Sequence, residues 1–205
     1  MKLYYHPFSQ HARRVRVLCQ ELGLKPELML VALEKGEHLA RKFVGLNPAH
    51  AVPVLDDDGF VLAESNAIMR YLCDRHHGDR FYPRDGAARA LVDQWLDWNH
   101  CKLNPPLQTL TVQLMFMGDK ADAGIVDKAR READEALKVL DAGLLAGRGM
   151  GGKEASLADV AIATTVALHE PCGVSLEAVP RVRSWYEGIK RWPSFAATSP
   201  MPTAA

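Results

Sequence analysis

Three short stretches of the chain carry residues whose types could do chemistry. Ser9 stands between a short hydrophobic run and a helical pattern. Pro53 interrupts the hydrophobic run "VPVL", although proline cannot donate a hydrogen bond to a neighbouring strand. Glu64 and Ser65 stand where another hydrophobic run gives way to a second helical pattern. A helix N-terminus attracts anions and a serine hydroxyl can hydrogen-bond to them, so these stretches indicate that a small ligand is held there.

Hydrophobic spacing indicates which elements must position these residues. "KLYY" is typical of a short strand, and apolar residues then recur at helical spacing until Gly23, which marks the end of a helix. "ELMLVAL" predicts a second strand, and "VPVL" and "FVL" flank the turn-forming "DDDG", so they predict a hairpin. A further helix is predicted from Ser65. This succession predicts a thioredoxin-like α/β domain over residues 1–78.

The rest of the chain has a different pattern. Residues 79–86 are rich in glycine, proline and charge and are predicted to be a linker. Beyond them almost no strand signal remains, and we expect a helix over 87–116 with a kink at Pro105 and Pro106. Further helices follow, one of them starting at "SLAD" and apolar nearly all round, whereas "PSFAATSPMPTAA" is expected to be irregular. The second domain, 87–205, is therefore predicted to be an all-α helical bundle.

Composition narrows the class of protein. Among 205 residues, 48% are hydrophobic, and 25 basic residues balance 25 acidic ones, so a nucleic acid or an anionic membrane is not expected as the main partner. No apolar run approaches the roughly 18 residues of a membrane span, and the N-terminus turns polar too early for a signal peptide. Scattered cysteines without a CxxC pair indicate reduced thiols and a cytoplasmic protein. These cysteines are Cys19, Cys73, Cys101 and Cys172.

Three motifs resemble those of the cytosolic glutathione S-transferases, in that family's order and at its spacing. They are "NPAHAVPVL", "ESNAIMRYL" and "SLADVAIA", and the resemblance covers essentially the whole chain. It implies the glutathione transferase fold, with glutathione as co-substrate. "SQ" followed by an Arg-Val resembles the serine-type members, so the sequence is similar to a theta-, phi- or delta-like bacterial member.

The resemblance implies where glutathione binds. Pro53 would follow a cis peptide bond, and Val52 would offer its main-chain N–H and C=O to the cysteinyl unit of the peptide. Ser65 and the helix N-terminus favour the γ-glutamyl carboxylate, and Glu64 can bind the ammonium group. For the glycyl carboxylate, His50 matches insect and theta-like members and His38 matches the plant phi class; both need not hold.

The resemblance also implies a residue that activates the thiol. Ser9 is favoured, and Tyr5 is the rival because tyrosine-type members carry their phenol there. A free thiol has a pKa of ~8.5, and lowering it to ~6.5 requires about 2.7 kcal/mol of thiolate stabilisation. A hydrogen bond to a charged group supplies ~1.5–3 kcal/mol and a helix N-terminus ~0.3–1 kcal/mol, so one hydroxyl there is sufficient. The beta class has a cysteine where this chain has Gln10, which disfavours a thiol-reductase mechanism.

The electrophile pocket is expected between the two domains, on the kinked helix. Its candidate residues are Asn99, Leu103, Asn104, Leu107 and Met115. Simple helix packing explains each of them equally well. Cys73, His76 and His77 have a spacing that could ligate a metal, but a helix end with solvated histidines accounts for them, and no metal site is expected.

The leading interpretation is a glutathione transferase that directs the thiolate of glutathione to small, hydrophobic electrophiles in detoxification. The resemblance also implies a homodimer, with no nucleic-acid or membrane partner. Two alternatives stay open. The chain could be a non-catalytic, transferase-like binding or adaptor module, or a glutathione-dependent isomerase, dehalogenase or peroxidase.

Overall fold

The chain folds into two compact units. The computed structural model describes residues 1–144, 150 and 154–200. The first unit comprises Met1–Tyr82 together with the segment that begins at Trp192, and the second comprises Pro83–Arg191. The C-terminal segment thus belongs with the α/β residues, and not with the helical ones as the predicted boundaries had it. No helix among the described residues has the length and apolar character needed to cross a membrane.

A four-stranded mixed sheet organises the first unit, in the order β2-β1-β3-β4. β1 runs parallel to β2 and antiparallel to β3, which in turn is antiparallel to β4. The β3–β4 hairpin turns at Asp58 and Gly59, both with positive φ, as a two-residue hairpin loop requires. The strands are β1 (Lys2–Tyr5), β2 (Glu27–Leu30), β3 (Val54–Asp57) and β4 (Phe60–Ala63).

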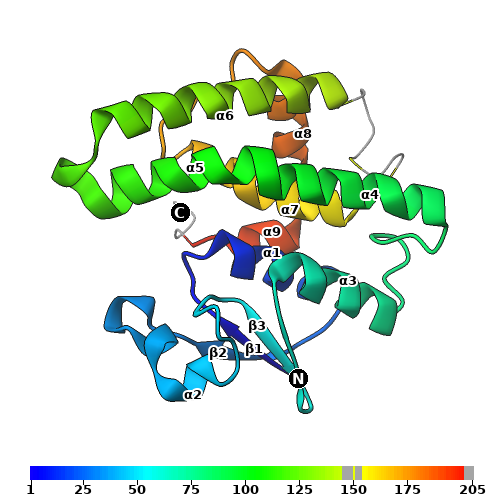
Figure 1. Ribbon diagram of the computed structural model, residues 1–205. Coiled ribbons are helices and arrows are strands. Elements are labelled where there is room, and N and C mark those ends of the chain that lie inside the picture. The colour runs from blue at the N-terminus through cyan, green and yellow to red at the C-terminus, as the bar shows by residue number, and fades with distance from the viewer. Residues whose placement is uncertain (145–149, 151–153, 201–205) are drawn as a thin grey trace. The chain divides into compact units, whose positions relative to one another are not determined.

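Helices lie on both faces of this sheet (Figure 1). Tyr4 and Val54 share one face, where they pack with Phe43 of α2. Their neighbours Leu3 and Leu55 point to the opposite face and are fully buried, because successive side chains of a strand alternate. On that face α1 and α3 pack against each other. The helices are α1 (Gln10–Glu21), α2 (Arg41–Val44) and α3 (Ser65–Arg75), with short turns η1 (Leu33–Lys35) and η2 (Glu37–Leu39) before α2. The predicted thioredoxin-like domain is confirmed.

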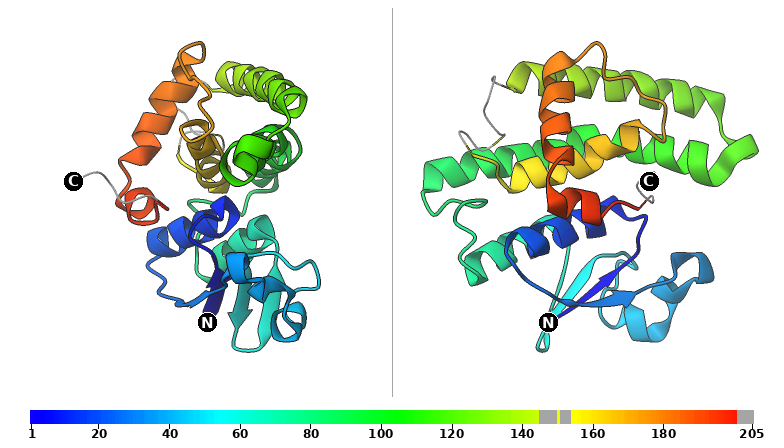
Figure 2. Two further views of the ribbon diagram at one scale, coloured as in Figure 1. Left: turned by 90° about the vertical axis from the view of Figure 1, so that its left-hand side faces the viewer. Right: turned by 180° about the vertical axis from the view of Figure 1, so that it is seen from behind.

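The C-terminal segment contains a helix that the sequence did not predict. α9 (Pro193–Ala197) lies against α1, and Figure 2 shows the two side by side in both views. The expectation of an irregular segment was wrong for Pro193–Ala197, because a five-residue helix leaves too short a periodic pattern to recognise. Residues 201–205 of that segment lie outside the described residues. Its stability comes from packing, since Phe195 is 2% exposed.

The second unit is helical, as predicted. Its first helical run continues through α4, η3, α5 and η4, and η3 and η4 are π-helical. Pro105 and Pro106 therefore neither break nor end the run, because they lie in the first turn of α5 and the π turn before them absorbs the missing N–H donors. The run comprises α4 (Gly86–Trp98), η3 (Asn99–Leu103), α5 (Asn104–Thr111) and η4 (Val112–Met117).

Within this unit α7 packs against α4, α5 and α8, whereas α6 packs mainly against α5. Every residue of α7 is buried, which confirms the prediction from its apolar sequence. The helix begins with a capping box, in which Ser156 and Asp159 exchange hydrogen bonds. The elements that follow η4 are η5 (Gly118–Lys120), α6 (Ala123–Gly143), α7 (Leu157–Val166), η6 (Ala167–His169) and α8 (Pro180–Lys190).

Candidate active site

Strand register brings several connecting segments to one end of the sheet. Tyr5 lies opposite Leu30, Tyr4 opposite Val54, and Val54 opposite Ala63. The chain therefore leaves β1, β2 and β4 at the end of the sheet where it enters β3. The predicted residues in the segments at this end are Ser9, His38, His50, Val52, Pro53, Glu64 and Ser65.

Ser9 caps the N-terminus of α1. Its Oγ accepts a hydrogen bond from the N–H of Ala12 at 3.2 Å, and its carbonyl accepts one from the N–H of Arg13 at 2.8 Å. A serine hydroxyl has one donor and two acceptor positions. Because the cap uses an acceptor position, the hydroxyl proton stays available for an anion at the helix N-terminus. Ser9 is partly exposed, so a ligand can reach it.

Tyr5, the rival activator, is placed differently. It is the last residue of β1, and the guanidinium of Arg16 lies 5.0 Å from the centroid of its ring. Arg16 is two helical turns beyond Ser9 along α1, which corresponds to about 10 Å of helix rise. The aromatic face of Tyr5 is thus engaged by a cation well inside the helix, whereas Ser9 stands at the end where a helix attracts anions.

The segment before β3 presents open main chain. The Val52–Pro53 peptide bond is cis, as the resemblance implied, and both residues are buried. Within the described residues, neither the N–H nor the C=O of Val52 has a hydrogen-bond partner. The preceding loop is held by Asn47, whose Nδ2 donates to the carbonyl of Ala51 at 2.9 Å and whose Oδ1 accepts from the N–H of Ala49 at 3.0 Å.

Glu64 and Ser65 form the junction between β4 and α3. Glu64 has φ 69° and ψ 110°, a conformation that costs a non-glycine residue about 1–3 kcal/mol and that occurs often at functional sites. Its side chain is exposed, whereas Ser65 is 6% exposed at the first position of the helix. The carbonyl of Glu64 accepts the first helical hydrogen bond, from Ile68, at 2.9 Å. The junction therefore presents an accessible carboxylate beside a helix N-terminus.

A buried cation lies next to this junction. Nη1 of Arg14 donates to Oδ1 of Asn66, the second residue of α3, at 3.3 Å. Burial lowers the pKa of Arg14 to about 9, so the guanidinium keeps its charge at neutral pH. Arg14 thus adds positive charge near the N-terminus of α3, where an anionic group is expected to bind.

The structure brings the two candidate histidines together. Nδ1 of His50 lies 3.4 Å from the carbonyl oxygen of His38, and His50 is exposed with φ 56°. Nδ1 of His38 is buried and has no hydrogen-bond partner within the described residues. The two predictions, taken from different classes of the family, therefore concern one place on the surface.

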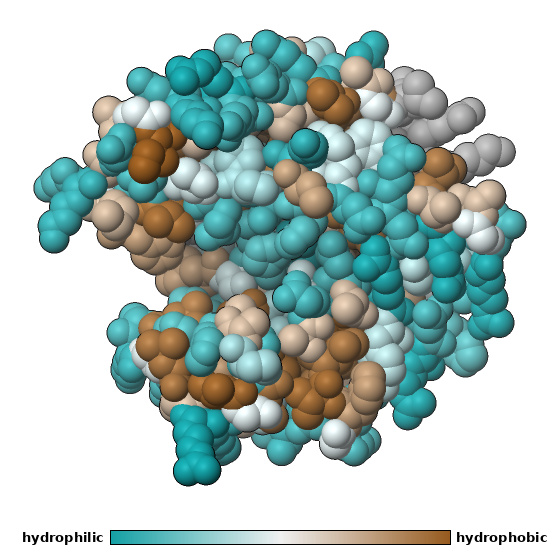
Figure 3. Space-filling model, in the orientation of Figure 1, coloured by the Kyte–Doolittle hydropathy of each residue, from teal (hydrophilic) through white to brown (hydrophobic). Residues whose placement is uncertain are grey.

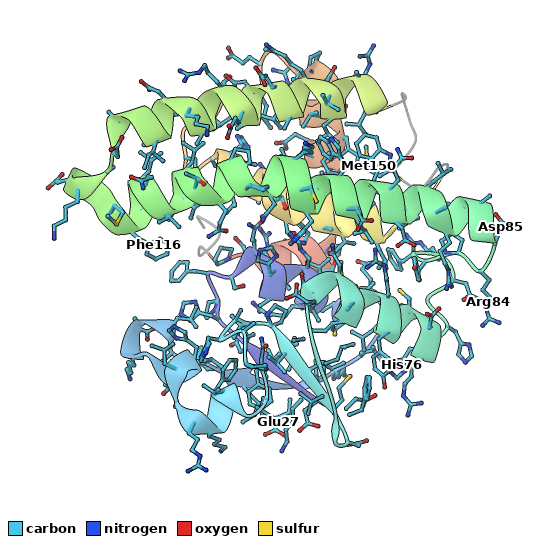
Figure 4. All side chains as sticks on the ribbon, in the orientation of Figure 1. Glu27, His76, Arg84, Asp85, Phe116 and Met150 are labelled. Atoms are coloured by element: carbon cyan, nitrogen blue, oxygen red, sulfur yellow. The ribbon has the colours of Figure 1, made fainter. Side chains whose placement is uncertain are left out.

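The predicted electrophile-pocket residues differ widely in exposure. Asn99, Leu103 and Leu107 have no exposed surface, which favours packing inside the helical unit, and Asn104 is 8% exposed. Met115 in η4 is 48% exposed, and the neighbouring Phe116, 70% exposed, projects from the end of the helical run (Figure 4). Met115 alone among these candidates is readily accessible, and the role of all of them stays a prediction.

Sequence reasoning missed two residues that shape the site. His6 orders the loop that carries Ser9: its Nδ1 accepts from the N–H of Phe8 at 3.3 Å, and its carbonyl accepts from the N–H of Ser9 at 3.0 Å. Asn47 does the same for the loop before Val52. An asparagine before a proline is a turn signal, so "NP" could have identified Asn47, whereas no local pattern identified His6.

The protein's own buried thiols are poor nucleophiles. Burial raises the pKa of Cys19 to about 12, and burial also raises the pKa of Cys172. The thiolate is the nucleophilic form of cysteine, so a raised pKa makes both thiols less reactive.

Known proteins share both the sequence and the fold. The family model "Glutathione S-transferase, N-terminal domain" matches residues 3–80. Glutathione S-transferase D7 of Anopheles gambiae is 35% identical over 92% of this chain and 85% of its own. The chain belongs to the glutathione S-transferase family. Glutathione S-transferase theta-1 of Rattus norvegicus is 33% identical over 93% of this chain and 82% of its own. A delta-class glutathione transferase of Nilaparvata lugens superposes with TM-score 0.88 at 34% identity, covering 97% of this chain and 92% of that one.

Membership in the glutathione S-transferase family explains why these connecting segments meet. A thioredoxin-like sheet places main-chain groups without hydrogen-bond partners among the described residues, a helix N-terminus and a hydroxyl group at one end. A short peptide with charged ends and a central thiol has complementary groups for each of them.

Proposed function

We propose that this glutathione transferase activates the thiol of glutathione with Ser9. The observation that carries the proposal is the capping geometry: Ser9 Oγ accepts from Ala12 at 3.2 Å, so its proton is left to donate to the sulfur. The N-terminus of α1 favours the same anion. Tyr5 is the less suitable group because its ring is engaged by Arg16.

Glutathione is held by the groups around Ser9. The open N–H and C=O of Val52 pair with the cysteinyl unit, as an added strand would. Ser65 and the N-terminus of α3 bind the γ-glutamyl carboxylate, with Arg14 adding charge through Asn66. Glu64 binds the ammonium group. His38 and His50 lie together, and this favours a shared site for the glycyl carboxylate.

The reaction joins the sulfur to an electrophilic carbon. The thiol proton is lost to solvent, and the thiolate donates an electron pair that forms the new carbon–sulfur bond. A leaving group then departs with its bonding electrons, or, in an addition, the product takes up a proton. The protein contributes by lowering the thiol pKa and by holding both reactants. Small hydrophobic electrophiles in detoxification are the proposed substrates, and the exposed Met115 supports an apolar binding surface.

Titration of the bound thiolate by its ultraviolet absorbance tests the role of Ser9. Ser9→Ala removes the hydrogen bond and should raise the apparent pKa of bound glutathione by about 1–2 units, since a bond to a charged group is worth about 1.5–3 kcal/mol. Ser9→Thr keeps a hydroxyl and should restore most of the shift, and Tyr5→Phe should change little. An unchanged pKa in Ser9→Ala, with a raised pKa in Tyr5→Phe, would transfer the role to Tyr5.

We also propose that the protein is a cytoplasmic homodimer. Exposed apolar side chains of the first unit support an interface, among them Leu39 at 62% and Phe60 at 50% exposure. Figure 3 shows hydrophobic side chains gathered on the surface of the unit that carries η2 and α2. Sedimentation equilibrium should give twice the mass of one chain at micromolar concentration, and the mass of one chain throughout would contradict the dimer. The scattered cysteines support a reducing compartment.

A further inference from the structure

The first turn of α1 is tied to the C-terminal segment of the chain. The guanidinium of Arg13 lies 3.9 Å from the centroid of the Phe195 ring, and its Nη2 donates to the carbonyl of Phe195 at 3.0 Å. Its Nε lies 3.5 Å from Oγ1 of Thr198. Arg13, Phe195 and Thr198 are all buried, at 7%, 2% and 0% exposure. A residue of the first turn is thus fixed from outside its own helix.

The same residue completes the cap that holds Ser9. The N–H of Arg13 donates to the carbonyl of Ser9 at 2.8 Å, next to the bond from the N–H of Ala12 to Ser9 Oγ. Helix ends tend to fray, because their first N–H groups have no helical partners and local opening there costs little free energy. Fraying of this turn would release the Ser9 hydroxyl. A side chain anchored in α9 opposes that motion, since Arg13 cannot leave the helix without losing its contacts with Phe195.

We propose that Arg13 is a positioning residue for the activation of glutathione, and that α9 serves as its anchor. The inference rests on the proposed role of Ser9. Arg13 acts through the first turn of α1 and does not touch the reacting atoms. The C-terminal segment thereby contributes to thiol activation, although about 180 residues separate Phe195 from Arg13 in the sequence.

A second contact between the same two helices provides a matched control. Oγ of Ser194 donates to Oε1 of Glu21 at 2.5 Å, at the opposite end of α1. Ser194→Ala should therefore loosen α9 from the last turn of α1 and leave the first turn intact. It tests whether any weakening of the α1–α9 contact is enough to change the thiol pKa.

The decisive experiment measures the thiolate pKa of bound glutathione and the thermal midpoint in the same set of variants. Phe195→Leu keeps the charge of Arg13 and removes the aromatic ring beneath it, and Arg13→Met removes the charge as well. Both should raise the apparent pKa by about 0.5–1 unit, a part of the ~1–2 units expected from loss of the Ser9 hydroxyl. The apparent pKa in Arg13→Lys should lie between the values in Arg13→Met and in the parent protein. Ser194→Ala should lower the thermal midpoint and leave the pKa unchanged.

Three outcomes would overturn the inference. A lower thermal midpoint with an unchanged pKa in Arg13→Met and Phe195→Leu would make the contact purely structural. A raised pKa in Arg13→Met together with an unchanged pKa in Phe195→Leu would mean that the charge of Arg13 acts directly on the thiolate. An equal pKa rise in Ser194→Ala would mean a general effect of helix loosening. If Arg13→Met does not fold, Thr198→Val replaces it with the same readout. An unchanged pKa in Ser9→Ala itself would refute the proposed activator, a failure distinguishable from these three.

Discussion

Asp57 shows how a single carboxylate couples the hairpin to α3. The hydroxyl of Tyr71 donates to Oδ2 of Asp57 at 2.7 Å, and Nε of Arg75 lies 3.3 Å from the same oxygen. The hydrogen bond from Tyr71 is the main cause that holds the pKa of Asp57 below its usual value, with Arg75 contributing in the same direction. Both partners stabilise the ionised form, so the contact is strongest when Asp57 is charged.

The pH dependence of stability follows from that shift. A carboxyl group whose pKa is lower in the folded state stabilises the fold above its unfolded pKa, about 3.9 for aspartate, and loses that contribution as the pH falls through the folded value. Tyr71→Phe keeps the ring that lies 5.0 Å from the ring of Phe60 but removes the donor. We expect a loss of about 1 kcal/mol in urea unfolding at pH 7. The loss should shrink toward pH 3, and an equal loss at both pH values would contradict the assignment.

Single residues also mark the limit of what the sequence predicts. The positions of Ser9, Pro53 and the Glu64–Ser65 pair at strand and helix boundaries could be predicted, because hydrophobic spacing reveals those boundaries. The partners of Arg13 could not be predicted, because Phe195 and Thr198 contact Arg13 only through tertiary packing. Local patterns report on neighbours along the chain, and such long-range contacts leave no periodic trace.

The start of α7 depends on one buried carboxylate. Asp159 has no exposed surface and accepts hydrogen bonds from the main-chain N–H of Met150, from the N–H and hydroxyl of Ser156, and from Nε1 of Trp185. The Trp185 bond spans 2.9 Å and joins α8 to α7. Each donor would be left unsatisfied in the interior if the carboxylate were removed.

Asp159→Asn is therefore expected to be strongly destabilising although it preserves volume. The amide offers one acceptor oxygen and turns an NH2 group toward donors, so about 3 kcal/mol or more of unfolding free energy should be lost. Urea unfolding measures the loss. Asp134→Asn on the exposed face of α6 is the matched control and should change stability by less than about 0.5 kcal/mol. Similar losses in both variants would argue against the special role of Asp159.

The end of α3 depends on a close approach of the main chain. Gly78 donates its N–H to the carbonyl of Cys73 at 2.8 Å, and a Cβ on Gly78 would lie 2.7 Å from Cys73 Sγ and 2.8 Å from its Cα. Gly78→Ala should destabilise the protein by about 1–3 kcal/mol, because the clash involves backbone that cannot move aside. At Gly86 a Cβ would meet open space, so Gly86→Ala is the control for thermal unfolding. Equal thermal midpoints for the two variants would contradict the steric argument.

At the level of elements, it was easier to predict whether a segment is a helix or a strand than whether one helix continues into the next. The capping residues Ser9 and Ser156 predicted the helix starts correctly, because an N-cap hydroxyl bonds to main-chain N–H groups only two or three residues further along the chain. Pro105 and Pro106 predicted a kink or a break, and the helical run continues through them after a π turn, so there is no break. A π turn depends on packing against neighbouring helices, so the sequence of the run alone does not specify it.

At the level of the whole molecule, chain order and spatial order differ at the C-terminus. The predicted boundaries assigned every residue after 86 to the helical domain, because helical periodicity continues to Trp192. The segment beyond Trp192 instead completes the unit that begins with Met1. A boundary drawn from composition follows the sequence, whereas a folding unit is defined by burial, and Phe195 is buried against α1.

This arrangement predicts which unit is destabilised by a substitution in the C-terminal segment. Phe195→Ala removes a buried aromatic side chain and should cost about 3–5 kcal/mol. The loss should fall on the unit that contains α1, so hydrogen exchange should speed up at the amides of α1 and leave α6 near its parent rates. Tyr186→Ala, at a buried position of α8 in the second unit, should give the opposite pattern. Faster exchange in α6 with α1 still protected in Phe195→Ala would place the C-terminal segment in the helical unit, because the amides that lose protection identify the unit to which a buried side chain belongs.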